Sequence, residues 1–488
     1  MSEWQFYGRQ VELTQLTSIL QRRRWFFVKI TGRRRIGKTT LIQKALPTDP
    51  VRSLLYVQIP DSGDAGVLSA VADALETFQV PGERFPRPRT LADLAKLVEA
   101  LAMAGYAVIL DEFQYFNRAP FAEYCSLLQA AVDRLADQAH QVTGGLIVLG
   151  SIHTEMVALL EDRSAPLYNR VTDVLDLTHL DIASILAILR EHADDSPERL
   201  LFLWTLFEGV PKFYRDCWEQ SLLAADRAAL LRRIFFESSS PLRTEAENWF
   251  LRELRGHYDT VLKFVARNPG RSHGDLVEAI RQASGDSTHQ IGVYLSTLSE
   301  KYRLIERKLP VFASPKQRKG RYYLTDNFLQ SWLAALSTAV AAREFRPVDQ
   351  LVHEADARLQ DVEGAMLEKL VGALYEERSR KGIGDFPLTD RIKGYWDRSD
   401  TEIDLVAISE AVKVLRFGSC KRSPGKLLSD VTNFNGHVER FLDTFRQYRS
   451  WRIEKVGIAP RLNAEQRAVL ERHDVMPQDL FDLTKDLT

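Results

Sequence analysis

The stretch that decides the fold is WFFVKITGRRRIGKTTLIQKAL, residues 25–46, which predicts a strand, a loop and a helix in turn. Trp25–Ile30 is an apolar run of strand-favouring residues, and Thr40–Leu46 has the spacing of an amphipathic helix. Between them, Gly32–Thr39 matches the pattern G-x-x-x-x-G-K-[ST] in the context that this pattern requires. The sequence therefore predicts a phosphate-binding loop in an α/β domain, and a chance match in a loop rich in glycine and arginine is the alternative.

Each position in this loop has an expected role toward a nucleoside triphosphate. The glycines let backbone N–H groups curl around phosphate oxygens, and the start of the following helix adds a favourable dipole. Lys38 is placed to reach the β- and γ-phosphates, and the Thr39 hydroxyl is placed to bind Mg²⁺. We therefore predict ATP and Mg²⁺ as cofactors. The predicted cofactor-binding residues are Gly32, Arg35, Gly37, Lys38, Thr39 and Thr40.

An acidic pair further along the chain supplies the groups that a nucleotide hydrolase needs. The segment YAVILDEFQYF, residues 106–116, predicts a buried strand that ends at Asp111 and Glu112. We expect Asp111 to bind the water shell of Mg²⁺ and Glu112 to orient or activate the attacking water. A pair of acids that only caps the end of a strand is the alternative interpretation.

Two further polar positions are candidates for a role in hydrolysis. The segment GLIVLGSIHTEM predicts a third strand, after which Ser151 or His153 is a candidate sensor of the γ-phosphate. Capping of the next helix by Ser151 or Thr154 explains the same residues equally well. Arg170, in APLYNRV, is a candidate arginine finger for a neighbouring subunit, which would require a homo-oligomer. A solvated surface arginine is the alternative.

These motifs together carry a resemblance to a known family. FYGRQVELTQL, GRRRIGKTTL, VILDEFQYF, LGSIHTEM and APLYNR, in this order, resemble an AAA-related ATPase family of archaea and bacteria. That family belongs to the STAND-type NTPases, which are often described as signal-transducing or defence ATPases. Its members usually carry a small lid that ends in a Gly-Val or Gly-Pro motif, matched here by Gly209, Val210 and Pro211. The resemblance implies that this lid reads the bound nucleotide, whereas the residues alone indicate a helix break.

The middle of the chain has the element order of a winged helix. TVLKFVARNP, HGDLVEAIRQA and THQIGVYLSTLSEKYRLIERKL predict three short helices, and a hairpin-like stretch follows them to Asp326. In such a domain the second and third helices form a helix-turn-helix, and the third usually reads a major groove of DNA. A module that docks onto another protein is the alternative.

The charge of this region favours a nucleic-acid partner. Residues 257–323 contain 12 Lys and Arg against 6 Asp and Glu, a net charge of +6 in a chain whose net charge is −1. Four of these cations, Lys316, Arg318, Lys319 and Arg321, gather in the expected wing, where they would bind phosphates without reading sequence. A basic loop tip that is merely solvated is the alternative.

The last third of the chain carries a set of polar residues on one predicted helix and two predicted strands. DVEGAMLEKLVGALYEERSR predicts an amphipathic helix that carries Gly364 and Glu368. TEIDLVAI and VKVLRFGSCKRS predict strands that carry Asp404, and Cys420 with Lys421. This region resembles the PD-(D/E)xK nuclease superfamily, whose domain is often fused to these ATPases and whose order is a helix acid, a strand aspartate and then acid-x-Lys on the next strand. The resemblance implies a nuclease-like site of Glu368, Asp404 and Lys421.

One position departs from the superfamily pattern. Ser419 stands two residues before Lys421, where these nucleases have an acid that helps to hold one or two divalent metals. Serine brings no charge and is a poor ligand for Mg²⁺. Glu368, or Glu402 on the strand face of Asp404, is a candidate replacement. The sequence favours a degenerate binding or structural domain, and leaves open an active nuclease or an ordinary half-buried hairpin.

The bulk composition indicates where in the cell the protein is located, but it does not indicate a partner. The chain has 488 residues, of which 45% are hydrophobic and 27% are charged, as in ordinary globular proteins. Its three cysteines, Cys125, Cys217 and Cys420, lie far apart and form no metal-binding pair. The polar start of the chain has no signal core, and no apolar run reaches the length of a membrane helix. We expect a soluble cytoplasmic protein without a membrane partner.

The predicted architecture is an α/β P-loop NTPase core with three appended domains. The predicted boundaries are 1–180 for the core, 181–255 for a helical lid, 256–345 for the winged helix and 346–488 for the nuclease-like domain. The predicted function is an ATP-binding, slowly hydrolysing molecular switch that couples nucleotide state to the winged helix and the nuclease-like domain, acting on or near nucleic acid. The alternative is an ATP-regulated, metal-dependent DNA or RNA nuclease in defence against mobile elements.

Overall fold

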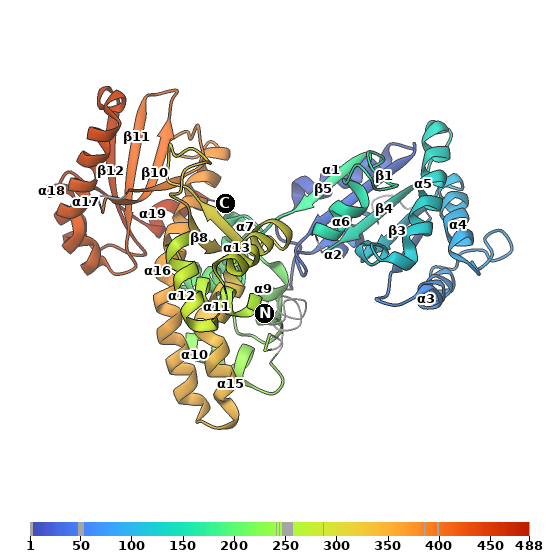
Figure 1. Ribbon diagram of the computed structural model, residues 1–488, viewed down its shortest axis with the longest axis horizontal. Coiled ribbons are helices and arrows are strands. Elements are labelled where there is room, and N and C mark those ends of the chain that lie inside the picture. Colours follow the sequence, from blue (N-terminus) through green and yellow to red (C-terminus); the bar gives the residue numbers. More distant parts are fainter. Residues whose placement is uncertain are drawn as a thin grey trace. The chain divides into compact units, whose positions relative to one another are not determined.

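The computed structural model divides the chain into two compact units (Figure 1). The N-terminal unit is Gly8–His179, and the C-terminal unit is Leu180–Thr488 together with Met1–Tyr7. The structure describes residues 3–46, 53–151, 153–240, 242, 243, 245, 257–285, 287–384, 386–397 and 400–487.

The N-terminal unit is built on a parallel sheet of five strands in the order β2-β3-β4-β1-β5. The strands are β1 (Phe26–Gly32), β2 (Leu54–Gln58), β3 (Ala107–Asp111), β4 (Gly145–Gly150) and β5 (Asp173–Leu177). The three central strands, β3, β4 and β1, are largely apolar and almost entirely buried because helices cover both faces of a parallel sheet. The helices are α1 (Gln10–Gln21), α2 (Lys38–Ala45), α3 (Asp64–Thr77), α4 (Leu91–Met103), α5 (Ala122–Asp137) and α6 (His153–Leu160). The predicted α/β core is thereby confirmed.

The strand order determines where a site forms in this unit. β4 lies between β1 and β3, with Phe26 and Ala107 both opposite Gly145 in the register. The carboxyl ends of these three strands therefore meet at one edge of the sheet, where ligands of open α/β sheets bind. The phosphate-binding loop, the acidic pair and Ser151 follow those three ends.

The C-terminal unit begins with a group of helices. They are α7 (Ile182–His192), α8 (Pro197–Phe207), α9 (Pro211–Glu219) and α10 (Arg227–Leu231). Gly209 and Val210 separate α8 from α9, and Pro211 starts α9, where its missing N–H needs no partner. Residues 241, 244 and 246–255 of the predicted lid, and residue 256 of the predicted winged helix, lie outside the described residues.

A small helical domain with a three-stranded sheet follows. Its elements are α11 (His257–Arg267), β6 (Arg271–Ser272), α12 (His273–Ser284), α13 (Thr288–Ser296), β7 (Ile305–Lys308) and β8 (Arg321–Leu324). The antiparallel sheet has the order β6-β8-β7, so that the β7–β8 hairpin lies at its edge. Ser272 and Ser287 accept hydrogen bonds that start α12 and α13. Two short helices, α14 (Asn327–Ser331) and α15 (Ser337–Ala341), then lead into the longest helix, α16 (Val348–Arg380).

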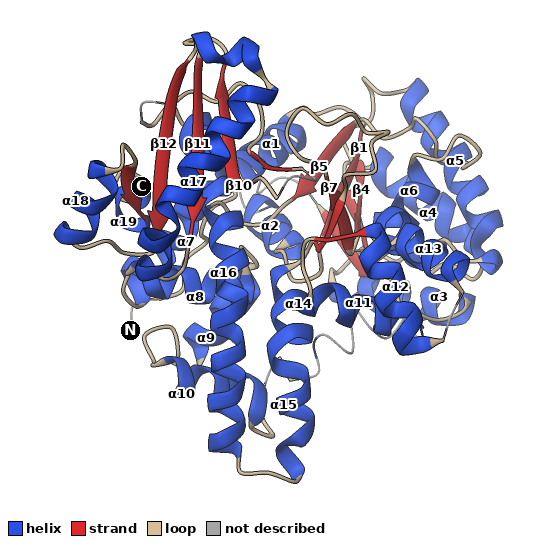
Figure 2. Ribbon diagram, turned by 60° about the vertical axis from the view of Figure 1, so that its left-hand side comes forward, coloured by secondary structure: helices blue, strands red, loops and turns tan. Residues whose placement is uncertain are grey.

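The C-terminal sheet has five strands in the order β13-β12-β11-β10-β9 (Figure 2). They are β9 (Lys393–Trp396), β10 (Glu402–Ser409), β11 (Val414–Cys420), β12 (Arg452–Ala459) and β13 (Met476–Asp479). β10 pairs antiparallel with both β9 and β11, whereas β12 pairs parallel with both β11 and β13. The remaining helices are α17 (Pro424–Thr444), α18 (Ala464–Arg472) and α19 (Leu480–Thr484). α17 packs on β10, β11 and β12, and α16 contacts β10.

Across the described ranges, none of the helices combines the length and the apolar character that crossing a membrane requires. The three cysteines are free and buried.

Candidate functional site

The phosphate-binding loop is tightly folded between β1 and α2. Gly32 has a φ of 150° and Gly37 a φ of 97°, a region that favours glycine. A Cβ atom added at Gly32 would lie 2.5 Å from the carbonyl oxygen of Leu177 on β5. Arg35, between the glycines, has a φ of 66°. The two glycines are therefore required by the loop itself, independently of any ligand.

Lys38 is folded over the loop that precedes it. Its Nζ donates hydrogen bonds to the carbonyl oxygens of Gly32 at 2.9 Å and Arg33 at 3.2 Å. Burial lowers the pKa of Lys38 to about 8, although the charges of Glu112 and Asp111 oppose this shift. The ammonium is thus held where a phosphate group would give it a stronger, charged partner.

Thr39 and Asp111 come from different elements and meet at the sheet edge. The Thr39 Oγ1 donates to Asp111 Oδ2 at 3.1 Å, and the Tyr56 hydroxyl donates to the same oxygen at 2.6 Å. The Glu112 N–H donates to Asp111 Oδ1 at 2.8 Å. A hydroxyl beside a carboxylate is a ligand set suited to Mg²⁺, so these residues fit the predicted ion.

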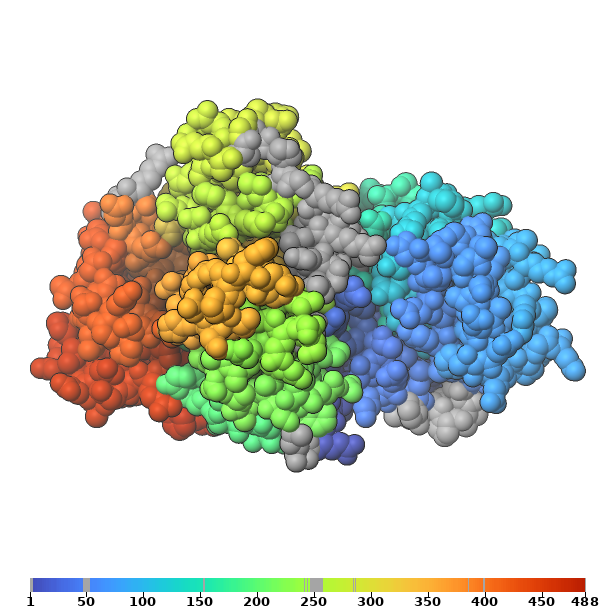
Figure 3. All heavy atoms as spheres, turned by 90° about the horizontal axis from the view of Figure 1, so that it is seen from below, coloured from blue at the N-terminus to red at the C-terminus, as the bar shows by residue number. Residues whose placement is uncertain are grey.

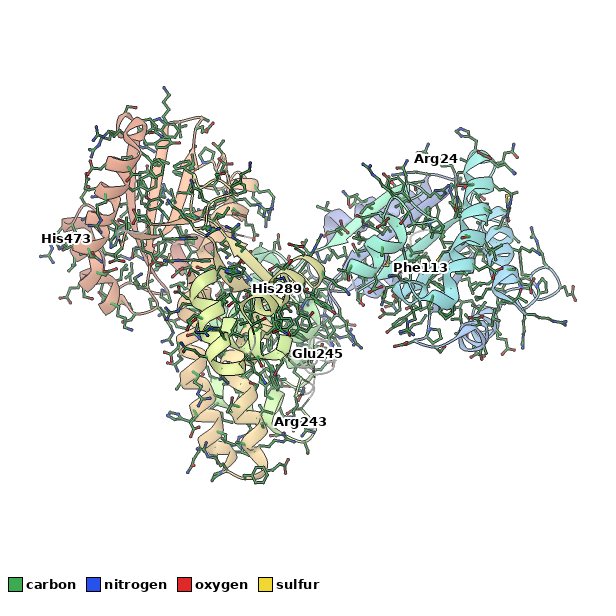
Figure 4. All side chains as sticks on the ribbon, in the orientation of Figure 1. Arg24, Phe113, Arg243, Glu245, His289 and His473 are labelled. Carbon is green, nitrogen blue, oxygen red and sulfur yellow. The ribbon has the colours of Figure 1, made fainter. Side chains whose placement is uncertain are left out.

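Glu112 is held by two polar side chains. Its Oε2 accepts hydrogen bonds from the Gln114 amide and from the Ser151 hydroxyl, the latter at 3.2 Å. The Ser151 N–H in turn donates to Gln114 Oε1 at 3.3 Å. Phe113 (Figure 4), which follows Glu112, is buried and anchors the segment in the core. The side chain of His153 lies outside the described residues, so that Ser151 is the candidate sensor seen in contact with the acid.

Arg170 is engaged inside the N-terminal unit. Its Nε and Nη2 donate to the two carboxylate oxygens of Asp133 on α5, at 2.7 and 3.0 Å. Its Nη1 donates to the carbonyl oxygen of Tyr168 at 2.8 Å. A role as an arginine finger stays a prediction, and would require the guanidinium to leave this two-pronged ion pair.

Three residues that contact the site have no role predicted from the sequence. Tyr56 lies on β2, and burial together with its bond to Asp111 raises the pKa of its hydroxyl well above the usual range. Gln114 lies within the quoted DEFQYF segment but was given no role. Arg9, from the FYGRQ segment, donates hydrogen bonds to the carbonyl oxygen of Ile36, at 3.5 Å, and to that of Thr178. It therefore links the phosphate-binding loop to the segment after β5.

A second polar cluster lies on the C-terminal sheet. Asp404 Oδ2 accepts hydrogen bonds from Lys421 Nζ at 2.9 Å and from the Cys420 N–H at 2.7 Å. Glu368, on α16, faces this pair: burial and the charge of Asp404 raise the pKa of its carboxyl to about 8. Burial also raises the pKa of Asp404. The structure therefore brings the three predicted nuclease-like residues together.

This second cluster lacks the third acid of a nuclease. Ser419 is buried on β11, opposite Gly457 of β12. Glu402 is turned to another partner, because Arg321 binds its two carboxylate oxygens at 2.6 and 3.3 Å. In the part of the chain that the structure describes, no group of three or more His, Cys, Asp or Glu is placed to hold a metal. The residues present do not complete a nuclease metal site.

The four cations of the predicted basic wing lie in two different environments. Lys316, Arg318 and Lys319 are exposed, as expected for phosphate-binding residues. Arg321 is not, because its guanidinium pairs with Glu402 and lies 4.6 Å from the centre of the Trp396 ring. The set of four solvent-facing cations is thus reduced to three.

Comparison with known proteins identifies the N-terminal part of the chain. Residues 6–212 match a family described as an ATPase domain predominantly from Archaea. The chain is 26% identical over 417 residues to an uncharacterized protein of Methanocaldococcus jannaschii, covering 85% of this chain and 87% of that protein. Residues 6–212 are therefore similar to an archaeal ATPase domain.

Solved structures agree with this fold assignment. A Walker-type ATPase of Pyrococcus abyssi is similar with a TM-score of 0.52 and 17% identity, over 67% of this chain and 96% of that chain. The ORC2 protein of Aeropyrum pernix, in ADPNP–ADP complexes, is similar with a TM-score of 0.47 and 17% identity, over 73% of this chain and 95% of that chain. The first of these likenesses supports the P-loop ATPase fold.

Replacing Glu112, the acid predicted to orient the attacking water, should separate binding from hydrolysis. We expect Glu112→Gln to lower the rate of ATP hydrolysis by about 100-fold or more, because a positioned general base contributes that much. Affinity for ATP should change little, since Lys38 and the loop are intact. Phosphate release and nucleotide titration measure the two effects. Glu155→Gln is the matched control, and wild-type hydrolysis by Glu112→Gln would contradict the assignment.

The loop geometry predicts a stability effect that needs no ligand. We expect Gly32→Ala to destabilise the N-terminal unit by about 2 kcal/mol or more, through positive-φ strain and the approach to Leu177. Gly82→Ala is the control, because an added Cβ there meets nothing within 4 Å. Thermal unfolding of both variants measures the difference, and equal melting temperatures would show that the loop is not constrained.

Proposed function

We propose that this chain is an ATP-dependent switch, in which binding and slow hydrolysis of ATP in the N-terminal unit set the state of a winged helix and a non-cutting nuclease-like domain. The observation that supports the proposal is the placement of α16. This one helix binds the first helix after the ATPase unit and Glu208, which directly precedes the Gly-Val-Pro segment, and it carries Glu368 of the nuclease-like cluster.

At its carboxyl end, α16 holds the start of α7. The Glu377 carboxylate, which is 3% exposed, accepts hydrogen bonds from the N–H groups of Ile182 at 2.7 Å and Ala183 at 3.1 Å. Lys381 neutralises this carboxylate at 2.9 Å and also binds Asp181 at 3.2 Å. Because helix starts favour negative charge, this contact fixes α7 where the chain enters the C-terminal unit.

In its middle, α16 binds the segment that the family resemblance assigns to nucleotide reading. Lys369 Nζ lies 2.9 Å from a carboxylate oxygen of Glu208, which directly precedes Gly209. The same ammonium donates to the side chain of Asn327 at 2.7 Å. Figure 3 shows residues of the α15–α16 region against the green lid helices, and α16 contacts α8 and α10.

The same stretch of α16 also reaches the nuclease-like cluster. Glu368, next to Lys369 in the chain, faces Asp404. One and a half turns earlier, Glu363 is 2% exposed and binds Arg422 at 2.7 Å and Arg227 of α10. Because a packed helix moves as a body, a shift of the lid would move Glu368 relative to the sheet.

The chemistry of the N-terminal unit would follow from its own residues. The loop N–H groups and Lys38 would bind the phosphates of ATP. Thr39 and Asp111 are the residues to hold Mg²⁺, which neutralises charge on the phosphates when it is bound. Glu112, fixed by Gln114 and Ser151, would orient the attacking water.

Two domain assignments belong to this proposal. The order α11-β6-α12-α13-β7-β8, with its edge hairpin, supports a winged helix. The order α16-β9-β10-β11-α17-β12, with Glu368, Asp404 and Lys421 converging, supports a nuclease-like domain. The buried serine at position 419 supports a domain that binds or holds rather than cuts.

An ATP-regulated nuclease is the second candidate, and one observation favours it. Glu368 lies near enough to Asp404 that the charge of Asp404 helps to raise the pKa of the Glu368 carboxyl, so Glu368 is a replacement acid in reach. The choice between the candidates depends on whether two carboxylates bind a metal well enough to cleave.

A cleavage assay distinguishes the two candidates. We expect wild-type protein to leave plasmid, single-stranded DNA and RNA intact with Mg²⁺ or Mn²⁺, with and without ATP. Ser419→Glu should restore cleavage, because it returns the missing carboxylate beside Lys421. Ser419→Gln is the control for size without charge. Cleavage by wild type that Asp404→Ala abolishes would contradict the non-cutting proposal and establish the nuclease.

The contribution of the α16–α7 contact to the free energy of unfolding should be measurable. We expect Glu377→Gln to destabilise the C-terminal unit by about 2 kcal/mol, because it weakens two backbone hydrogen bonds to a buried charge. ATP hydrolysis in the N-terminal unit should persist. Glu354→Gln is the control on the same helix, since Glu354 pairs with Arg346 at the surface. Calorimetric unfolding compares the variants, and equal stability would remove this contact from the account.

A further inference from the structure

The loop between β7 and β8, residues 309–320, is fastened to the C-terminal sheet at both ends. The Val311 N–H donates to the carbonyl oxygen of Gly394 on β9 at 2.9 Å. At the other end, the Trp396 indole donates to the carbonyl oxygen of Lys319, also at 2.9 Å. This wing loop therefore lies along β9 and is not a free tip.

Aromatic packing fixes the first half of the wing loop. The Phe312 ring stacks on Tyr448, with centroids 5.1 Å apart and planes 12° apart, and also meets Phe445 at 5.2 Å. Val311 is buried in the core of the nuclease-like domain. Phe312 has a φ of 63°, a strained conformation for an aromatic residue that persists only where surrounding contacts determine it.

An arginine beneath the wing loop fixes its second half. Arg307 on β7 donates to the carbonyl oxygens of Pro315 at 3.3 Å and Gln317 at 2.7 Å. A Cβ added at Gly320 would lie 2.2 Å from Arg307 Nε, so a larger residue at this position would displace the Arg307 side chain. Arg321, bound to Glu402 and the Trp396 ring, closes the loop.

The exposed side chains of the wing loop include positively charged residues but no negatively charged ones. Residues 309–320 include Lys316, Arg318 and Lys319 and no Asp or Glu. These three side chains are exposed, and among the described residues none of their charged groups has a hydrogen bond or an ion pair. A merely solvated tip needs no such support, whereas a preorganised set of cations suits a polyanion.

The location of the loop indicates which polyanion. Glu402, which Arg321 binds, is two residues from Asp404 on β10, so the loop lies beside the nuclease-like cluster. By contrast α13, with His289 labelled in Figure 4, has no Lys or Arg in Thr288–Ser296. Positive charge is therefore gathered on the wing loop and not on the helix that would read a groove.

We infer that the wing loop and β9 form one composite surface that binds the phosphodiester backbone of a nucleic-acid strand and leads it past the Asp404–Lys421 cluster. This inference rests on the proposed nucleic-acid role of the C-terminal unit and adds its binding surface. Lys316, Arg318 and Lys319 make the phosphate contacts. Phe312, Trp396 and Arg321 are positioning residues that hold the loop.

The first test removes the charges. The full-length variant Lys316→Ala/Arg318→Ala/Lys319→Ala is titrated with fluorescent 30-nucleotide DNA, its duplex and RNA of the same sequence, between 50 and 200 mM salt. We expect a loss of affinity of about 10-fold or more and a salt slope smaller by about 2 to 3. The control is Arg22→Ala/Arg23→Ala/Arg24→Ala, which removes the same charge from the N-terminal unit (Arg24, Figure 4). Equal losses in the two variants would overturn the inference.

The second test keeps the charges and releases the loop. Phe312→Ala should weaken binding by about 3- to 10-fold with an unchanged salt slope, because it removes preorganisation and no phosphate contact. Wild-type affinity in Phe312→Ala would overturn the role of the anchor.

The third test locates the bound strand. Because the native cysteines are buried, Lys393→Cys on β9 can be labelled selectively with an iron chelate. We expect this label to cut the bound strand, and a label at Lys413→Cys, in the turn that joins β10 to β11, not to cut it. Equal cutting by both labels would overturn the assigned path.

Two outcomes separate this inference from the proposed ATPase. If ATP is hydrolysed but no nucleic acid binds with or without ATP, the surface is wrong and the ATPase stands. Binding of poly-glutamate in place of every nucleic acid would reassign the surface to an acidic protein. If nucleic acid binds through the wing loop but ATP is not hydrolysed, the surface stands and the switch fails.

Discussion

The buried carboxylate of Glu377 is the contact on which the arrangement of the C-terminal unit depends. An ionised carboxylate out of water is costly unless it is paired and hydrogen-bonded, and here Lys381 and two N–H groups at the start of α7 meet that need. Because α16 is one continuous helix of 33 residues, the position of α7 and the position of Glu368 are tied together. A displacement of the start of α7 would therefore be transmitted through α16 to Glu368 and the C-terminal sheet.

The parts of the fold that sequence predicted are those set by short-range chemistry. The strand, loop and helix around Gly32 and Gly37 need left-handed backbone at fixed spacing, which leaves a readable motif. Asp111 and Glu112 follow a buried strand whose apolar run marks its end. Parallel strands bring their carboxyl ends together, so local motifs were sufficient to predict that these residues lie at one edge of the sheet.

What sequence could not predict depends on pairs that are distant in the chain. Tyr56 reaches Asp111 only because β2 pairs with β3, and neither strand carries a signal for that partner. Arg321 and Glu402 are 81 residues apart, and their ion pair removes one cation from the expected wing and one acid from the expected cluster. Ser419 was visible in the sequence, but only the structure shows that Glu402, a candidate replacement, is paired with Arg321. The same contact explains why the wing and the C-terminal sheet are joined.

The central claim is that nucleotide state reaches the C-terminal sheet through α16. The most direct measurement is hydrogen exchange of the whole chain with a non-hydrolysable ATP analogue and with ADP, using Lys38→Ala as the control. The account predicts that amide protection in Glu363–Glu377 and in β10 differs between the two nucleotides in wild type and not in the control. Differences confined to residues 8–179 would contradict it, and would leave an ATPase that is not coupled to the rest of the chain.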